Sequence, residues 1–138
     1  MFDMSAAFDC CDNDIICNKM KIYGLADSTI QWFKTFLTGR RQCVEIGGAL
    51  SIELEVESGF PQGGILSPLL FILLTSDLHL WLNHCEGEGF ADDVTTSCSD
   101  PDENQVICKL EEDASRTLEF MAASMLSANP KKTKFLQN

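Results

Sequence analysis

The stretch Phe90-Ala-Asp-Asp93, followed by Val94-Thr-Thr96, determines how this sequence is interpreted. Two adjacent carboxylates lie between an apolar segment and a β-branched segment, so we expect Asp92 and Asp93 at the tip of a strand–turn–strand unit. Adjacent residues on a strand face opposite ways, but a tight tip presents both. A third carboxylate, Asp3, lies near the start of the chain. If it reaches this tip, the group suits a hard divalent cation.

These carboxylates leave two interpretations open. An Asp–Asp pair in a sequence is most often a solvated turn, and Asp3 is then an ordinary polar residue near a terminus. The alternative is a site for two metal ions about 3.5–4 Å apart, as in-line displacement at phosphorus requires.

The composition limits the class of protein. The 138 residues carry 21 acidic and 10 basic side chains, a net charge of −11, and are 45% hydrophobic. This length suits one domain, and the hydrophobic fraction is too high for a disordered tail. No Lys or Arg occurs from Gln42 to Cys108, which excludes bulk attraction of nucleic acid by that span. An alternative is therefore a non-enzymatic acidic domain that binds a basic protein partner through Glu53, Glu55 and Glu57.

The cysteines and the apolar segments bear on location. Seven cysteines without a CxxC pair indicate reduced thiols rather than a disulfide framework, and no structural zinc site. The apolar run over residues 69–82 contains Asp77 and His79, and it is shorter than the roughly 20 residues that span a bilayer. We expect an intracellular protein without a membrane segment, in either the nucleus or the cytoplasm.

Hydrophobic spacing predicts two helices in the first third of the chain. Residues 12–22 form one, capped by Asp12 or Asn13 and followed by Gly24. A second helix is expected to be capped by Ser28 and to run to residue 37, with Gly39 beyond its end.

The remaining segments predict strands and two further helices. Residues 52–57 alternate apolar and acidic side chains, typical of a strand with one dry face, and Gly47-Gly48 suggests a hairpin with residues 42–46. Ser67-Pro68 predicts the start of a helix to residue 82. Asp100-Pro101 predicts another, with proline in the first helical position and an apolar face running to Met125, before Asn129-Pro130. The sequence therefore predicts an α+β fold.

Two other segments have ligand-binding chemistry. The loop over residues 58–64 combines glycines, which allow close approach of a ligand, with Pro61 and the amide of Gln62. Residues 129–134 form a basic cluster suited to phosphate. An ordinary connecting loop and a solubilising tail remain the alternatives.

The order of four segments resembles a known family. They read Asp3-Met-Ser-Ala-Ala-Phe8-Asp9, then Gly59-Phe-Pro-Gln-Gly63, then Phe90-Ala-Asp-Asp93, then Asn129-Pro-Lys-Lys-Thr133. This order is similar to motifs A to D of a reverse transcriptase palm, and most similar to those of non-LTR (LINE- or jockey-like) retrotransposons. The resemblance covers residues 1–138, as a partial reverse transcriptase domain that includes the segment between motifs A and B. It implies a palm-like antiparallel sheet backed by helices, with Asp3 beside the Asp92–Asp93 turn.

The resemblance also implies roles for single residues. Asp3 matches the motif A aspartate, and Asp92 and Asp93 match the motif C acids, which together bind two Mg²⁺ ions, with Mn²⁺ as an alternative. One ion lowers the pKa of the primer 3′-hydroxyl, and the other neutralises the triphosphate as pyrophosphate leaves.

Five further positions match residues that contact the substrate. Phe8 matches the aromatic gate that crowds a ribose 2′-hydroxyl. Pro61, Gln62 and Gly63 match the motif B loop that touches the incoming nucleotide and the template. Lys132 matches the motif D lysine, a candidate general acid for pyrophosphate.

The resemblance implies template-directed DNA synthesis, with an RNA template, a DNA primer and dNTPs as partners in a full-length parent. The chain starts two residues before Asp3, so we expect it to lack the N-terminal part of the fingers, the thumb and an endonuclease domain. We therefore expect the isolated chain to be inactive, unless a protein partner supplies the missing parts. A decayed or domesticated element is the alternative.

Three departures from the family pattern stand out. Phe90 replaces the usual tyrosine, and Gly64 and Ser67 exchange the usual serine and glycine in the motif B loop. Residues 85–89 contain Gly and Glu, which are poor strand formers, so a short or frayed motif C hairpin is expected.

Overall fold

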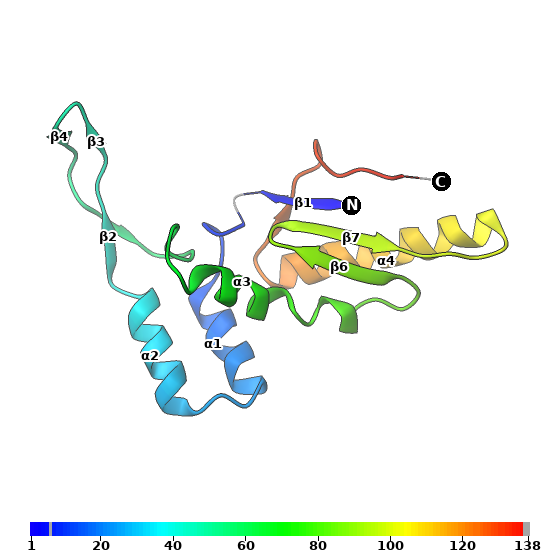
Figure 1. The fold of residues 1–138 in the computed structure, drawn as a ribbon, viewed down its shortest axis with the longest axis horizontal. Coiled ribbons are helices and arrows are strands. Elements are labelled where there is room, and N and C mark those ends of the chain that lie inside the picture. The colour runs from blue at the N-terminus through cyan, green and yellow to red at the C-terminus, as the bar shows by residue number, and fades with distance from the viewer. Residues whose placement is uncertain (6, 137–138) are drawn as a thin grey trace.

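The computed structural model describes residues 1–5 and 7–136 and has a mixed α+β architecture, as predicted (Figure 1). Its elements are β1 (Phe2–Ser5), α1 (Asn13–Ile22), α2 (Asp27–Leu37), β2 (Arg40–Gln42), β3 (Glu45–Ile46), β4 (Ala49–Leu50), β5 (Leu54–Val56), α3 (Ser67–Thr75), the 3₁₀ turn η1 (Leu78–Leu80), β6 (Glu86–Phe90), β7 (Asp93–Ser97), α4 (Glu103–Ala123) and β8 (Ser127–Ala128).

The main sheet has four strands in the order β6-β7-β1-β8. Each neighbouring pair is antiparallel. Helix α4 runs behind this sheet and contacts β7 and β8 (Figure 1). Strand β1, close to the start of the chain, therefore lies between segments from near its other end.

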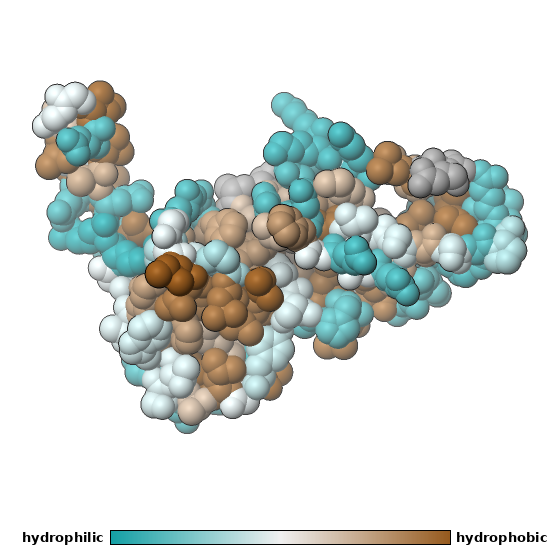
Figure 2. All heavy atoms as spheres, viewed as in Figure 1, coloured by the Kyte–Doolittle hydropathy of each residue, from teal (hydrophilic) through white to brown (hydrophobic). Residues whose placement is uncertain are grey.

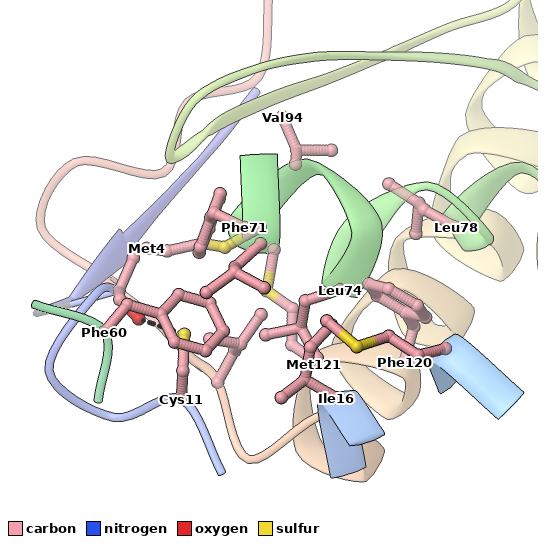
Figure 3. Close-up of a cluster of buried hydrophobic side chains, with 14 of the residues drawn as sticks. Met4, Cys11, Ile16, Phe60, Phe71, Leu74, Leu78, Val94, Phe120 and Met121 are labelled. Atoms are coloured by element: carbon pink, nitrogen blue, oxygen red, sulfur yellow. Dashed lines mark hydrogen bonds between the residues drawn. The ribbon is translucent and has the colours of Figure 1, made fainter. Parts of the chain in front are cut away.

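One hydrophobic core joins the sheet to helices α1, α3 and α4. Val94 of β7 is 1% exposed, and Ile16, Leu74 and Phe120 from the three helices are each 1% exposed or less (Figure 3). Burial of one such side chain contributes roughly 1.5–3 kcal/mol. The sheet and its three helices are therefore one packed unit.

The first two helices agree closely with the prediction. The Asp12 carboxylate caps α1 by accepting from the N–H groups of Asp14 and Ile15, and Gly24 follows with a left-handed φ of 81°. Helix α2 begins earlier than predicted, because Ala26 rather than Ser28 is the cap residue. This cap makes no side-chain hydrogen bond; its carbonyl accepts the first helical N–H groups instead.

The third helix is shorter than predicted. The expected helix to residue 82 ends at Thr75, and only the η1 turn follows. The ammonium group of Lys19 donates to the Leu74 carbonyl and to the Asp77 carboxylate, each at 2.5 Å. The hydroxyls of Thr75 and Ser76 also donate to carbonyls of the last turn, which competes with continued helix.

The start and the buried face of the fourth helix differ from the prediction. Pro101 is not helical, because Asp102 caps α4 and the helix starts at Glu103. Leu118, predicted on the apolar face, is 47% exposed, whereas Asp113 is fully buried. Met125, also predicted on that face, lies beyond the end of α4 at Ala123 and is 61% exposed. The apolar pattern alone therefore places the helix but misses a buried acid.

Residues 40–56 form a projecting arm (Figure 1). The predicted hairpin is confirmed, but its ladder is interrupted: β2 pairs with β5 over three residues and β3 pairs with β4 over two. The predicted dry face is wrong, because Ile52 and Leu54 are 79% and 59% exposed. Within residues 1–5 and 7–136, no other element packs on this arm closely enough to bury either face, and Figure 2 shows apolar residues at its tip.

Among the described residues, no helix combines the length and the apolar character needed to cross a bilayer.

Candidate active site

A two-residue turn joins β6 to β7 and contains Asp92. Phe90 pairs with Asp93 across this turn, and Ala91 between them has a left-handed φ of 54°. That conformation costs a residue with a Cβ roughly 1–2 kcal/mol, so the surrounding strands must hold the turn. The predicted tip with two adjacent carboxylates is therefore present.

Strand β6 is complete, which corrects the expectation of a short or frayed hairpin. Five consecutive residue pairs link it to β7. A Cβ added at Gly87 would lie only 2.6 Å from Cδ1 of Leu82, so this glycine permits a close contact. Tertiary packing therefore overrides the low strand propensity of glycine and glutamate.

Strand β1 brings a third carboxylate to this turn. Asp3 lies directly opposite Asp93 in the antiparallel register. The Met4 N–H donates to the Asp92 carbonyl at 3.1 Å. Asp3, Asp92 and Asp93 are all half-buried, so they gather at one end of the sheet without leaving contact with solvent.

The segment after β8 adds a cation. Nζ of Lys132 lies 3.1 Å from Oδ2 of Asp3, and the two side chains are 66% and 14% exposed. The Asn129 N–H donates to the Asp3 carbonyl at 2.7 Å, which anchors the segment to β1. The residue expected in motif D therefore forms an ion pair with the residue expected in motif A.

The donor chemistry of these carboxylates fits Mg²⁺ in part. Within residues 1–5 and 7–136, no cluster of three or more His, Cys, Asp or Glu side chains is arranged to hold a metal ion. Mg²⁺ commonly binds through one or two carboxylates together with water and substrate phosphates. The hard oxygen donors present thus fit a site that a substrate completes.

The loop over residues 58–64, expected to be motif B, docks backbone to backbone on the segment after β1. The N–H groups of Gly59 and Phe60 donate to the carbonyls of Cys11 and Phe8, each at 2.7 Å. A Cβ on Gly59 would lie 2.7 Å from the Asp9 carbonyl oxygen, and its φ is 84°. This junction accepts no side chain at position 59.

The expected substrate residues lie along this junction. The Phe8 ring stacks on Phe71 at 4.8 Å between centroids, so the core fixes its position. Pro61 is half-buried, while Gln62 and Gly63 are exposed. Pro61 and Gln62 line a polar hollow of about 760 Å³.

Sequence reasoning missed Asp9. Its Oδ1 accepts a hydrogen bond from Nε2 of Gln62 at 2.7 Å, and both residues line the hollow. The signal available was its position directly after Phe8, inside the quoted motif.

Sequence reasoning also missed Asp113 on α4. Its carboxylate accepts the backbone N–H groups of Asn83, His84 and Cys85 at 3.0, 2.8 and 2.6 Å. Burial alone raises the pKa of the Asp113 carboxyl, but these donors together hold it below its ordinary value. Burial, with Asp113 and Cys98 nearby, raises the pKa of the Cys85 thiol to about 12. The segment that leads into β6 is thereby tied to α4.

The sequence that forms this site is similar to those of known proteins. A family model described as reverse transcriptase (RNA-dependent DNA polymerase) matches residues 1–138. The chain belongs to the reverse transcriptase family. The antiparallel strands that place Asp3 opposite Asp93 therefore lie within a chain matched over its whole length by the reverse transcriptase family.

Two relatives from Drosophila melanogaster are similar to parts of this reverse transcriptase chain. The probable RNA-directed DNA polymerase from transposon X-element is 44% identical over 45 residues, which cover 33% of this chain and 5% of the relative. The probable RNA-directed DNA polymerase from transposon BS is 34% identical over 82 residues, which cover 55% of this chain and 8% of the relative. The chain thus corresponds to a small part of each relative.

Proposed function

We propose that this chain is the catalytic palm of an RNA-directed DNA polymerase of the non-LTR (LINE- or jockey-like) type. In a full-length parent it adds dNTPs to the 3′-hydroxyl of a DNA primer on an RNA template. The observation that carries this proposal is the register that sets Asp3 opposite Asp93, with Asp92 in the adjoining turn.

In this proposal Asp3, Asp92 and Asp93 hold two Mg²⁺ ions, for which Mn²⁺ can substitute. The ions would activate the primer hydroxyl and offset the charge of the triphosphate. The ion pair between Lys132 and Asp3 supports a site that attracts positive charge. The same contact keeps the Lys132 ammonium group near the place where it would donate a proton to pyrophosphate.

The substrate residues act by shape and hydrogen bonding. The Phe8 ring, held against Phe71, would crowd a 2′-hydroxyl and so select deoxynucleotides. Gln62 would contact the nucleotide, and Pro61 and Gly63 would shape the loop along the template. The loop is well placed for this because its backbone is docked directly behind Phe8.

Primer extension on an RNA template with Mg²⁺ tests the proposal. The chain is joined to the fingers and thumb of a relative, because we propose that the isolated palm does not clamp a primer–template. Asp92→Asn should lower extension at least about a hundredfold, the usual effect of removing a group that stabilises a transition state. Glu53→Gln, which removes a carboxylate from the arm, is the matched control. Equal extension by Asp92→Asn and the parent would contradict the proposal.

The arm supports a second candidate function. Glu53 and Glu55 on the arm and Glu57 directly after it are exposed, which suits a basic protein partner. Such a partner should be retained by an Asp3→Asn/Asp92→Asn variant and lost on reversal of the three glutamate charges. The opposite pattern would reject this candidate. Partner binding through these glutamates would favour a decayed or domesticated domain over a catalytic palm only if primer extension failed as well.

A further inference from the structure

The position of Asp9 beside Gln62 gives the amide of Gln62 a defined orientation. A carboxylate at neutral pH only accepts hydrogen bonds, whereas an amide has a donor end and an acceptor end. The 2.7 Å contact with Oδ1 of Asp9 therefore requires the NH₂ end of Gln62 to face Asp9. The carbonyl end, Oε1, is left pointing away from the carboxylate.

The base of this contact is rigid. Three hydrogen bonds join residues 58–60 to residues 8–11: the two backbone bonds at Gly59 and Phe60, and one from the Ser58 hydroxyl to the Asp9 carbonyl at 3.2 Å. Gly59 also lies too close to Asp9 for any Cβ. The backbones of residues 9 and 59 therefore cannot drift apart, and the contact between the side chains of Asp9 and Gln62 is made across a fixed gap.

The surroundings leave the carbonyl end of the Gln62 amide available to a ligand. Arg40, which lines the same hollow, is already committed to the carbonyls of Leu37, Ser58 and Gly59. Within the described residues, Oε1 of Gln62 has no hydrogen-bond partner, since the bond to Asp9 uses Nε2. An outward Oε1 is an acceptor, so it recognises a ligand that offers a hydroxyl or an amino group.

We propose that Asp9 is a positioning residue that fixes the Gln62 amide with its carbonyl oxygen toward the incoming nucleotide. This inference rests on the proposed function, because it assumes that Gln62 contacts a nucleotide. Without Asp9 the amide rotates between two orientations, and one of them presents a donor where an acceptor is needed.

The test is a double-mutant cycle on the chain joined to the fingers and thumb of a relative, as in the extension assay, with dTTP and Mg²⁺ as the probe on a dideoxy-terminated primer–template and Mg²⁺ alone as the blank. Asp9→Ala and Gln62→Ala should each weaken dTTP binding about tenfold, which corresponds to about 1.4 kcal/mol. The double variant should be no weaker than Gln62→Ala, because Asp9 acts through Gln62. Asp27→Asn, an exposed charge on α2, is the control and should bind as the parent does. Multiplicative losses, or unchanged binding by Asp9→Ala, would overturn the inference.

The side-chain amide of Gln62 supplies a second measurement that needs no nucleotide. Its Nε2 protons should be ordered by NMR relaxation in the parent and mobile in Asp9→Ala, with the thermal unfolding midpoint unchanged. A mobile amide in the parent would overturn the inference. An ordered amide in the parent, together with no dTTP binding by the chain joined to fingers and thumb, would support orientation by Asp9 while counting against the proposed function. The failure of one is thus distinguishable from the failure of the other.

Discussion

The two hairpins of this chain contrast in how local sequence relates to structure. In the arm, residues 40–56, the second strand segment alternates apolar and acidic side chains from residue 52 as a strand should, yet the ladder breaks into pieces of three and two pairs. The hairpin of β6 and β7 contains Gly87 and Gly89, each preceded by a glutamate, yet it pairs without interruption over five residues. Strand propensity therefore ranks these two hairpins in the wrong order.

Contacts outside each hairpin explain the difference. β7 lies between β6 and β1, its Val94 is buried in the core, and the segment entering β6 is bound by Asp113. Among the described residues, the strands of the arm pair only with one another. The side chains of Ile46 and Leu50 at its tip are 77% and 67% exposed. An isolated two-stranded hairpin is marginally stable in water. The position that carries the candidate catalytic acids is thus the one that the rest of the fold fixes.

Removing the Asp113 carboxylate should weaken the anchored hairpin of β6 and β7, with the largest loss of stability among these predictions. Asp113→Ala removes a fully buried carboxylate that three backbone N–H groups share as their acceptor, and we expect a loss of about 3 kcal/mol in the free energy of unfolding. The measurement is urea denaturation followed by circular dichroism. Glu112→Ala is the control on the same helix, because Glu112 is exposed and, in the described part of the chain, its carboxylate bonds side chains at residues 83, 84 and 116 and no backbone N–H group.

Acid provides an independent check on Asp113. A carboxyl whose pKa is lowered by folding stabilises the folded state at pH values above its pKa in the unfolded chain, which is about 3.9. That stabilisation is lost as pH falls through the lower folded value. The stability difference between the parent and Asp113→Asn should therefore be constant near neutral pH and shrink only below about pH 4. A difference that shrinks already between pH 7 and pH 5 would show that another group is responsible.

The sequence predicts most elements of this fold but not what anchors them. Helix caps and glycines are local signals, so Asp12 and Gly24 mark the limits of α1 correctly. Asp113 gives no such signal, because a buried acid satisfied by three distant N–H groups looks like any charged residue on a helix. The shortened α3 depends on Lys19, 55 residues away from the carbonyl it binds.

In the candidate site, too, the sequence predicts some residues but not the contacts that hold them. Motif order predicts Asp3, Asp92, Asp93 and Lys132, because a resemblance to a family carries long-range information that periodicity lacks. Asp9 lies inside a quoted motif and still gives no hint of its bond to Gln62, since that bond joins residues 53 positions apart. The structure adds the partners of the motif residues, while their catalytic roles stay predictions.

Two glycines in β6 offer a smaller and more selective test. Gly87→Ala should destabilise the hairpin by about 1 kcal/mol, because its Cβ would meet Leu82 and force that side chain to shift. Gly89→Ala has no atom within 4 Å of the new Cβ, and it should stabilise the strand by about 0.5 kcal/mol. The two substitutions, two residues apart on one strand, should therefore change the stability in opposite directions. Equal effects in thermal unfolding would mean that the Leu82 contact is unimportant.

The smallest effect is expected in the arm. Leu54→Ala removes a side chain that is 59% exposed, so it should change the free energy of unfolding by less than about 0.5 kcal/mol. Val94→Ala, a loss of fewer atoms from a site that is 1% exposed, should cost about 1–3 kcal/mol, because a buried cavity is left. Hydrogen exchange adds a direct comparison: arm amides should exchange by local opening, and those of β7 only with the whole domain. Should Leu54→Ala cost as much as Val94→Ala, the arm must pack against something in solution. The contrast between a self-paired arm and an anchored hairpin would then fail.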